Sequence, residues 1–427
     1  MESVGVGLLG LGTVGIAVAR RLINEWELLG ERAGATPVLR CVAVRDVSRS
    51  RDLGLKNVRL LDDAAAVVDD PGVAIVMEAI GGTEPATALI ESALRAGKTV
   101  VTANKAVIAA SGPRLAALAG EHGAGLYFEA AVGAGLPIVA LLGDSLLGDR
   151  ISGLDCVING TTNVVLTKMR SAGMTFDSAL ADAQRRGFAE ADPTLDVDGW
   201  DAAQKLVILS WLAMGVHVPP EAIDRVGIRA VGADDVSALA ELGYHVRLLA
   251  HTERAPGDAV HLRVRPTAVG PGHLLGDVDD ADNAVIISSD LATRVMLRGL
   301  GAGGASTASA MVSDLVNAVR ERAAPRSRAL SRLRTATMLG DDDIEIAGYV
   351  RLQLTADGDA RALVLQALED RGLAVDAAVD LARAQLIVLT GVAPRAVHDR
   401  ALETLDTLSA VERIECTLDR VEVQAAT

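Results

Sequence analysis

The feature that most constrains the fold is a glycine motif near the start of the chain. Residues 4–9 read VGVGLL, and Gly10, Gly12 and Gly15 follow at once in the pattern G-x-G-x-x-G. Residues 13–26 have helical spacing. A strand that turns directly into a helix needs glycine where the turn is tight, where a phosphate approaches the backbone and where helix packs on strand. The motif therefore predicts a βαβ unit with a phosphate-binding turn.

This turn is predicted to hold the pyrophosphate of NADP or NAD. The backbone N–H groups and the positive end of the following helix attract phosphate. The residues predicted to contact the cofactor here are Gly10, Gly12, Thr13, Val14 and Gly15. The alternative is a glycine-rich turn that serves packing alone.

Strands and helices alternate through residues 1–130. Apolar, strand-like segments lie at 37–44, 73–80 and 98–103, and a helix is predicted at 85–97. This alternation is typical of a Rossmann-type, doubly wound parallel sheet. We therefore expect a dinucleotide-binding domain over residues 1–130, with Gly82 and Thr83 near the cofactor at the end of the third strand.

The end of the second strand bears on the choice of cofactor. An acid there favours the ribose hydroxyls of NAD, whereas an arginine can hold the extra phosphate of NADP. Arg45 stands at this end, and Asp46 follows it. We expect NADP to be preferred and NAD to remain compatible, although an exposed strand-end charge would also explain Arg45.

Two lysines are candidate catalytic residues. Lys105 follows the strand at 98–103, and ligands of doubly wound sheets bind beyond the carboxyl ends of strands. Lys205 follows Asp201 by four residues, so the two share a helix face. The segment after Lys205, LVILSWLAM, is apolar and predicts a buried helix. Nearby acids favour the charged form of a lysine and burial opposes it, so such a lysine can donate a proton to a developing alkoxide.

Simpler interpretations exist for this region. Lys105 could be a lysine on the helix surface. Asp201 and Lys205 could form a surface ion pair that stabilises the fold by only a few tenths of a kcal/mol. The acids that precede Lys205 are Glu190, Asp192, Asp196, Asp198 and Asp201. Such a group suits a cationic ligand, for example a substrate ammonium.

The rest of the chain predicts further domains. Residues 131–320 mix strands and helices and indicate an α+β domain for substrate binding and dimerisation, with a helix at 305–320 returning to the nucleotide domain. Residues 136–147 are expected to form a helix and residues 151–160 a strand. An arginine-rich linker is expected at 321–345. Residues 346–427 give the order βαββαβ, which is ferredoxin-like.

The composition limits the partners and the setting. The 427 residues carry a net charge of −15 and only 2% aromatics, which argues against nucleic acid as a partner. The three cysteines are scattered, so neither a disulfide framework nor a zinc site follows from them. With no basic leader and no long apolar run, we expect a cytoplasmic protein that does not insert into membranes.

Together these motifs resemble homoserine dehydrogenase over about residues 4–315. The matching segments are GLLGLGTVG, VVTANKA, YFEAAVGAGLPI, INGTTN, GFAEADPTLDVDGWDAAQK, GIRAV, RPTAV and GAGGASTASA. The resemblance implies hydride transfer between NAD(P)H and L-aspartate 4-semialdehyde, which gives L-homoserine in threonine, methionine and isoleucine biosynthesis. It implies a homodimer or homotetramer. Because no kinase-like segment precedes the glycine motif, we expect a form without a fused aspartokinase.

The resemblance also implies roles for individual residues. Lys205 matches the proton donor to the aldehyde oxygen, and Lys105 a second active-site lysine. Glu190 matches a substrate ligand, supported by Asp196 and Asp201. Two glycines, Gly187 and Gly303, fall where the family approaches the cofactor. The residues that match a site for a monovalent cation, Na⁺ or K⁺, are Glu129 and the carbonyls of Val132, Ala134 and Leu136; alternate carbonyls with a carboxylate suit a hard cation.

The C-terminal segment resembles the ACT-type regulatory module of many bacterial members. Modules of this type that bind amino acids usually carry Pro-Gly at the first strand–helix turn. Here the turn reads ADGDARAL, and Ala360 stands at the usual glycine position. We therefore expect the module to dimerise or to bind another ligand, rather than to bind threonine tightly.

Other function classes fit less well. A phosphorylating semialdehyde dehydrogenase needs a cysteine nucleophile, but Cys156 lies in the apolar run LDCVI and is expected in the core. A sugar or polyol dehydrogenase would not explain the segments EADP and NGTTN. A nucleotide-sensing protein without activity would not need Lys105, Glu190 and Lys205 together.

Overall fold

A computed structural model describes most of the chain. The described residues are 2–48, 57–322, 333–334, 336–340, 344–355 and 358–422. The chain divides into two compact units, and several segments contribute to each. The first consists of Met1–Ile151, Gln204–Ala222 and Ser289–Thr335, and the second of Ser152–Ala203, Ile223–Ser288 and Ala336–Thr427. Most of the linker predicted at 321–345 lies outside the described residues.

The first unit contains a six-stranded parallel sheet. Its strands are β1 (Ser3–Leu9), β2 (Thr36–Ala43), β3 (Arg59–Leu61), β4 (Ile75–Glu78), β5 (Thr99–Thr102) and β6 (Leu126–Tyr127). The spatial order is β3-β2-β1-β4-β5-β6, and each neighbouring pair is parallel. The strand order reverses between β1 and β4, which is where doubly wound sheets bind ligands. Strand β3 was not predicted.

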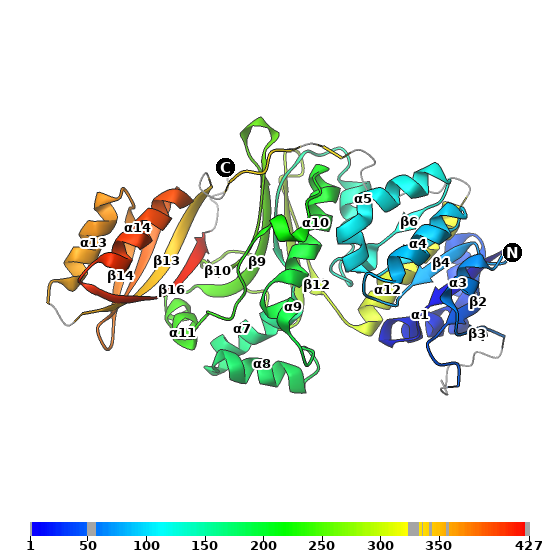
Figure 1. The fold of residues 1–427 in the computed structure, drawn as a ribbon, viewed down its shortest axis with the longest axis horizontal. Coiled ribbons are helices and arrows are strands. Elements are labelled where there is room, and N and C mark those ends of the chain that lie inside the picture. Colours follow the sequence, from blue (N-terminus) through cyan, green and yellow to red (C-terminus); the bar gives the residue numbers. More distant parts are fainter. Residues whose placement is uncertain are drawn as a thin grey trace. The chain divides into compact units, whose positions relative to one another are not determined.

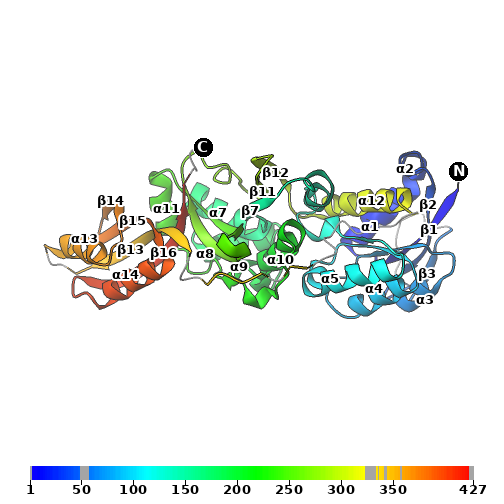
Figure 2. The same cartoon turned by 90° about the horizontal axis from the view of Figure 1, so that it is seen from above.

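Helices cover both faces of this sheet, as Figure 2 shows for α1 and α12 on one face and α4 and α5 on the other. The helices of this unit are α1 (Thr13–Asn24), α2 (Trp26–Ala33), α3 (Ala64–Asp69), α4 (Ala86–Arg95), α5 (Lys105–Glu121), α6 (Ile138–Ala140) and α12 (Gly304–Arg320), with short turns η1 (Glu129–Ala131), η2 (Leu141–Ser145) and η3 (Pro220–Ala222). Strand β12 (Arg294–Leu300) also belongs to it. Apolar side chains of α12, among them Met311 and Leu315, share a core with Val18 of α1. Residues far apart in the sequence therefore build one nucleotide-binding fold.

Three predicted elements differ from the observed ones. The helix expected over 13–26 breaks at Glu25 into α1 and α2. The helix expected over 136–147 consists of α6 and the wider turns of η2. The strand expected over 151–160 ends at Val157, because Asn159 caps the following helix.

The second unit contains an extended mixed sheet. Its strands run in the order β11-β7-β9-β10-β16-β13-β15-β14, and β8 pairs with β10. Their bounds are β7 (Ile151–Val157), β8 (Asp224–Arg225), β9 (His245–Arg254), β10 (Val260–Val269), β11 (Asp282–Ser289), β13 (Glu345–Leu354), β14 (Val375–Leu381), β15 (Gln385–Pro394) and β16 (Val411–Val421). The helices are α7 (Gly160–Ala172), α8 (Phe176–Arg185), α9 (Thr194–Val197), α11 (Ala233–Glu241), α13 (Ala360–Asp370) and α14 (Arg395–Thr407), with η4 (Pro256–Asp258). Helix α10 (Trp200–Met214) begins in the second unit and continues in the first.

The C-terminal segment has the predicted βαββαβ order. Its strands are arranged β16-β13-β15-β14 and pair antiparallel, which is the ferredoxin-like arrangement. Helices α13 and α14 lie side by side on this sheet (Figure 1). Strand β16 also pairs in parallel with β10, with Thr267 opposite Asp419. The C-terminal strands therefore continue the sheet of the middle segment.

A buried ion pair joins these two parts of the second unit. Asp235 of α11 is 1% exposed, and Arg351 of β13 donates to both its carboxylate oxygens, at 2.6 and 3.1 Å. The hydroxyl of Tyr349 donates to the same carboxylate at 2.9 Å. Buried charges are stable only when they are paired and hydrogen-bonded. This cluster therefore specifies how the C-terminal strands pack on α11.

We predict that Asp235→Ala lowers the free energy of unfolding by about 3–5 kcal/mol, because it leaves the Arg351 guanidinium buried without its partner. Denaturant unfolding monitored by circular dichroism measures this change. The control is Arg361→Ala, which breaks the exposed pair with Asp380 and is expected to cost less than about 1 kcal/mol. Equal losses in the two variants would contradict the prediction.

Candidate active site

The three motif glycines meet three different steric demands. Gly10 has φ +98°, a conformation that other residues rarely adopt. A Cβ atom at Gly15 would overlap the carbonyl oxygen of Gly10, so the helix can pack on the turn only if this residue is glycine. No heavy atom lies within 4 Å of a Cβ built at Gly12. The space above Gly12 is therefore open to a ligand.

A cavity of about 560 Å³ lies at the carboxyl ends of the parallel strands. Its lining residues are Gly10, Leu11, Gly12, Ala43, Val44, Arg45, Asp46, Asp62, Ala64, Ala79, Ile80 and Pro85. It brings Arg45 next to the glycine turn. The Asp46 carboxylate accepts hydrogen bonds from the backbone and hydroxyl of Ser48, at 2.9 and 2.6 Å. The other predicted cofactor contacts do not line this cavity.

A buried carboxylate organises the loop that carries Gly82. Glu78 is fully buried at the end of β4 and accepts bonds from the backbone of Ile80, at 2.8 Å, and of Gly81, at 3.2 Å. It also accepts a bond of 2.5 Å from the hydroxyl of Thr102. Sequence reasoning gave Glu78 no role, and its signal was an acid at the end of an otherwise apolar strand.

The start of α5 is tied to the same loop. The Asn104 side chain donates to the carbonyl of Gly82 at 2.7 Å and accepts from the backbone of Val107 at 3.2 Å, which caps the helix. Lys105 is the first residue of α5 and is half-buried. The structure thus joins the Gly82 loop to the start of α5, where Lys105 lies, through Asn104. Thr83 lies on the same loop.

Lys205 lies on the helix that the sequence predicted to be buried. Its side chain is only 8% exposed. Six residues later, Trp211 stacks on Phe128, with ring centroids 5.7 Å apart, and a Cβ atom at Gly112 of α5 would lie 2.5 Å from its ring. This packing holds α10 against α5, the helix that begins at Lys105.

One asparagine joins the acids of the segment before Lys205. The side-chain amide of Asn159 donates to Asp196 at 2.7 Å and to Asp201 at 2.8 Å. The Thr161 hydroxyl, which has a single hydrogen to donate, lies 2.7 Å from the carbonyl of Phe188 and 3.0 Å from the second oxygen of Asp196. Asn159 also caps α7, since its carbonyl oxygen accepts from the backbone of Thr162 at 2.8 Å. The segment INGTTN therefore assembles an acidic site, a role that its sequence did not reveal.

The remaining predicted residues lie in turns. The Glu190 side chain is exposed. Gly187 has φ +77° and Gly303 has φ +119°, so both adopt conformations that favour glycine. Gly303 caps α12, and a Cβ at the next residue, Gly304, would lie 2.6 Å from the methyl group of Thr13. The start of α12 therefore packs against the start of α1, beside the glycine turn.

The predicted cation loop is tightly folded. Glu129 is 5% exposed, and its two carboxylate oxygens accept from the backbone of Val139 and Ala140, both at 2.8 Å. Ala134 has φ +29°, and the Leu136 carbonyl accepts from the backbone of Ile138 at 2.8 Å.

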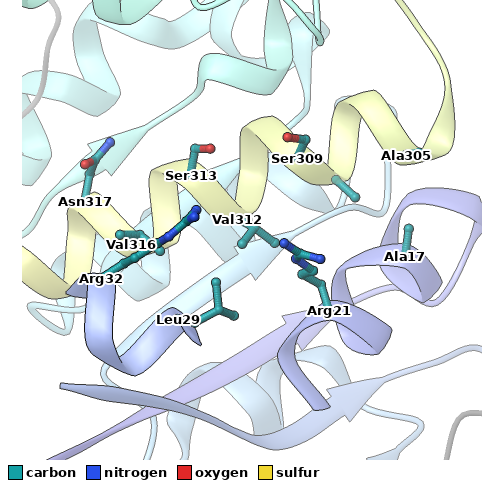
Figure 3. A pocket seen from close by; sticks show the side chains of 11 residues that line it. Ala17, Arg21, Leu29, Arg32, Ala305, Ser309, Val312, Ser313, Val316 and Asn317 are labelled. Atoms are coloured by element: carbon teal, nitrogen blue, oxygen red, sulfur yellow. The ribbon is translucent and has the colours of Figure 1, made fainter. Parts of the chain in front are cut away.

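Other features exclude alternatives or lie apart from the predicted residues. Cys156 is fully buried, and burial raises the pKa of its thiol well above the ordinary value, so it is not a nucleophile. A second cavity, of about 620 Å³, lies between α1, α2 and α12, where Arg21 and Arg32 face Ser309, Ser313 and Asn317 (Figure 3). None of the predicted site residues line it. Within the described residues, no helix combines the length and the apolar character needed to cross a membrane.

The glycine geometry predicts that two similar substitutions act differently. Gly15→Ala should lower the melting temperature, because the new methyl group overlaps the Gly10 carbonyl. Gly12→Ala should leave the melting temperature unchanged and weaken NADPH binding by 10-fold or more, if the open space receives the pyrophosphate. Thermal unfolding and fluorescence titration with NADPH measure the two effects. Tight NADPH binding by a folded Gly12→Ala protein would contradict this assignment.

A second prediction concerns pH and the attachment of α10. Burial lowers the pKa of His217, although its hydrogen bond of 2.7 Å to the Ala109 carbonyl raises it. His217 then binds a proton more tightly in the unfolded chain than in the folded chain. The contribution of neutral His217 to stability is therefore complete above pH 6.5 and is lost as the pH falls through the pKa of the folded state. NMR titration should place this pKa below 6.5. The variant His217→Gln should lose less stability between pH 7 and 5 than the parent; identical losses would contradict the prediction.

Comparison with known proteins identifies the family of this chain. Residues 10–129 match the family description "Homoserine dehydrogenase, NAD binding domain", and residues 137–316 match "Homoserine dehydrogenase". The homoserine dehydrogenase of Mycobacterium bovis is 38% identical over 98% of this chain and 97% of that protein.

Solved structures give the same result. A homoserine dehydrogenase from Thiobacillus denitrificans is 37% identical over 99% of both chains, with a TM-score of 0.94. A hyperthermophilic archaeal homoserine dehydrogenase in complex with NADPH is 31% identical over 74% of this chain and 98% of that chain, with a TM-score of 0.62. The chain therefore belongs to the homoserine dehydrogenase family of NAD(P)-dependent oxidoreductases.

Proposed function

We propose that Lys205 donates the proton to the aldehyde oxygen when L-aspartate 4-semialdehyde is reduced to L-homoserine. A dihydronicotinamide, when bound, would supply the hydride for the aldehyde carbon. The observation that carries this proposal is the burial of Lys205, four residues after the equally buried Asp201 on one helix. A lysine shielded from water near a carboxylate is oriented toward its acceptor, and its proton compensates the negative charge that develops on the oxygen. Lys105 is the second lysine that we assign to the reaction.

The acids of the second unit are proposed to bind the substrate ammonium. The Asn159 amide holds Asp196 and Asp201 close to each other. Two neighbouring carboxylates repel, and a cation relieves this repulsion. We assign Glu190, whose side chain is exposed, to direct contact with the amino acid, and Asp196 and Asp201 to the polar support.

Lys205→Ala tests the proposed proton donor. Loss of a general acid is expected to lower kcat by about 10²–10⁴-fold, with NADPH affinity and melting temperature near those of the parent. Steady-state absorbance assays at saturating L-aspartate 4-semialdehyde measure kcat. Lys168→Ala, in α7, is the matched control and should keep normal kcat. A Lys205→Ala enzyme with normal kcat would remove Lys205 from the mechanism.

NADP is the proposed preferred cofactor. Arg45 lies in the cavity beside the glycine turn, where a guanidinium can pair with the additional phosphate. The NADPH complex of the archaeal relative supports this choice, and NAD remains compatible.

Arg45→Ala should therefore raise the KM for NADPH by about 10-fold or more, the worth of a charge-assisted pair to phosphate, and leave the KM for NADH unchanged. Both values come from initial-rate assays with each cofactor. Equal changes for the two cofactors would refute a contact between Arg45 and the phosphate.

A monovalent cation, Na⁺ or K⁺, is proposed for the loop at Glu129. The loop offers a buried carboxylate and the carbonyls of Val132, Ala134 and Leu136, and the left-handed backbone at Ala134 turns the chain sharply between them. Oxygen donors of this kind suit a hard cation. The cation would supply positive charge that fixes the loop.

The C-terminal segment is proposed to be an ACT-type regulatory module. Its ferredoxin-like strand order supports this assignment. Ala360 is 2% exposed at the start of α13, so its methyl group fills the place where a ligand would approach the backbone. We therefore propose that the module serves homodimer or homotetramer assembly, or binds a ligand other than threonine. The domain boundaries at 130, 320 and 345 and the cytoplasmic location remain proposals.

A further inference from the structure

We propose that His251, Glu253 and His261 form a binding site for a divalent transition metal ion of the Zn²⁺ class, separate from the predicted site residues. One ligand atom from each of these residues lies within 4.8 Å of the others. Within the described residues, they are the only group of histidine, cysteine and acidic side chains with this spacing.

The register of the sheet brings these side chains together. His251 and Glu253 are two residues apart on β9, so they project from the same face. His261 on β10 is directly opposite Glu253, and directly opposed residues have neighbouring Cβ atoms. All three therefore come from regular, paired strands, and rigid elements hold metal ligands more precisely than loops do.

The ligand types favour a borderline metal ion. Two imidazoles and one carboxylate form the protein ligand set of many zinc sites that keep an open position. Imidazole nitrogen also suits Co²⁺, Ni²⁺ and Cu²⁺, whereas Na⁺, K⁺ and Mg²⁺ prefer oxygen. This preference separates the site chemically from the cation loop at Glu129.

A carboxylate orients one of the imidazoles. The Nδ1–H of His251 donates to Asp155 at 2.7 Å, and Asp155 is opposite His251 on β7. The bond turns Nε2 of His251 toward Glu253, with 3.7 Å between Nε2 and a carboxylate oxygen. Two ligands at about 2.0–2.1 Å from one zinc ion lie about 3.4 Å apart at the tetrahedral angle. The carboxylate–histidine pair is the usual outer support of a metal-bound imidazole.

The cluster has charged neighbours of both signs, one that repels a cation and others that attract it. Arg263 on β10 is opposite His251 and is repulsive, but it donates to Asp419 of β16 at 3.2 Å. The carboxylates of Asp155 and Glu253 attract a cation.

The test is a titration of tag-free, chelator-treated protein with Co²⁺ at pH 8, followed by the visible d–d absorption. We expect one Co²⁺ per chain, with the intense bands of a four- or five-coordinate ion, displaced by Zn²⁺ and unaffected by excess Mg²⁺ or Na⁺. Glu253→Gln and His261→Asn should remove this binding. Asp155→Asn should weaken it about 10–100-fold, the usual effect of losing an outer carboxylate.

The design separates loss of a ligand from loss of the fold. The Glu253 side chain is 50% exposed, so Glu253→Gln should keep the melting temperature of the parent. His122→Asn removes an exposed histidine at the end of α5 and should bind Co²⁺ normally. Absence of Co²⁺ binding in the parent, or equal binding in the parent and in Glu253→Gln, would overturn the proposal and leave His251 as an ion-paired histidine.

Discussion

Two carboxylates can stand together in a partly buried site only when donors hold them, and Asn159 is the donor on which the acidic site of this protein depends. Its amide hydrogens reach Asp196 and Asp201, while its carbonyl oxygen caps α7. One side chain therefore ends a strand, begins a helix and joins acids that are five residues apart on separate helices. The side chain that caps α7 therefore also sets the position of the two acids.

In the nucleotide-binding unit, too, a few buried side chains hold several backbone groups in place. Glu78 accepts backbone and hydroxyl hydrogens at the end of β4, and Asn104 extends the network to the first turn of α5. Loops at the switch point of the sheet would otherwise carry unsatisfied N–H groups beside the ligand, which is costly in a buried place. Preorganised loops of this kind lose little entropy when a cofactor binds.

A continuous sheet joins the C-terminal strands of the second unit to its middle segment. Strand β16 pairs with both β10 and β13, and the ion pair of Asp235 with Arg351 locks α11 onto the C-terminal strands. The proposed metal ligands also lie on β9 and β10. A ligand bound at the C-terminal strands would act on a sheet that is hydrogen-bonded directly to the middle segment.

The sequence by itself determined the local elements and the chemistry that depends on local pattern. Glycine spacing predicted the turn after β1, and the alternation of strands and helices predicted the parallel sheet. The spacing of apolar residues in the C-terminal segment predicted its βαββαβ order. The motifs also identified the family. These features depend on neighbours within a few residues, which sequence patterns record.

Only the tertiary structure decided which distant residues meet. Three contacts depend on strand order and on residues far apart in the chain. They are the hydrogen bond between Asn159 and Asp196, the pairing of β16 with β10, and the register that places His261 opposite Glu253. The end of β7 before Asn159 arose from capping that competes with periodicity. Burial, hydrogen-bond partners and cross-strand neighbours are properties of the folded chain, because each requires contacts that no local pattern specifies.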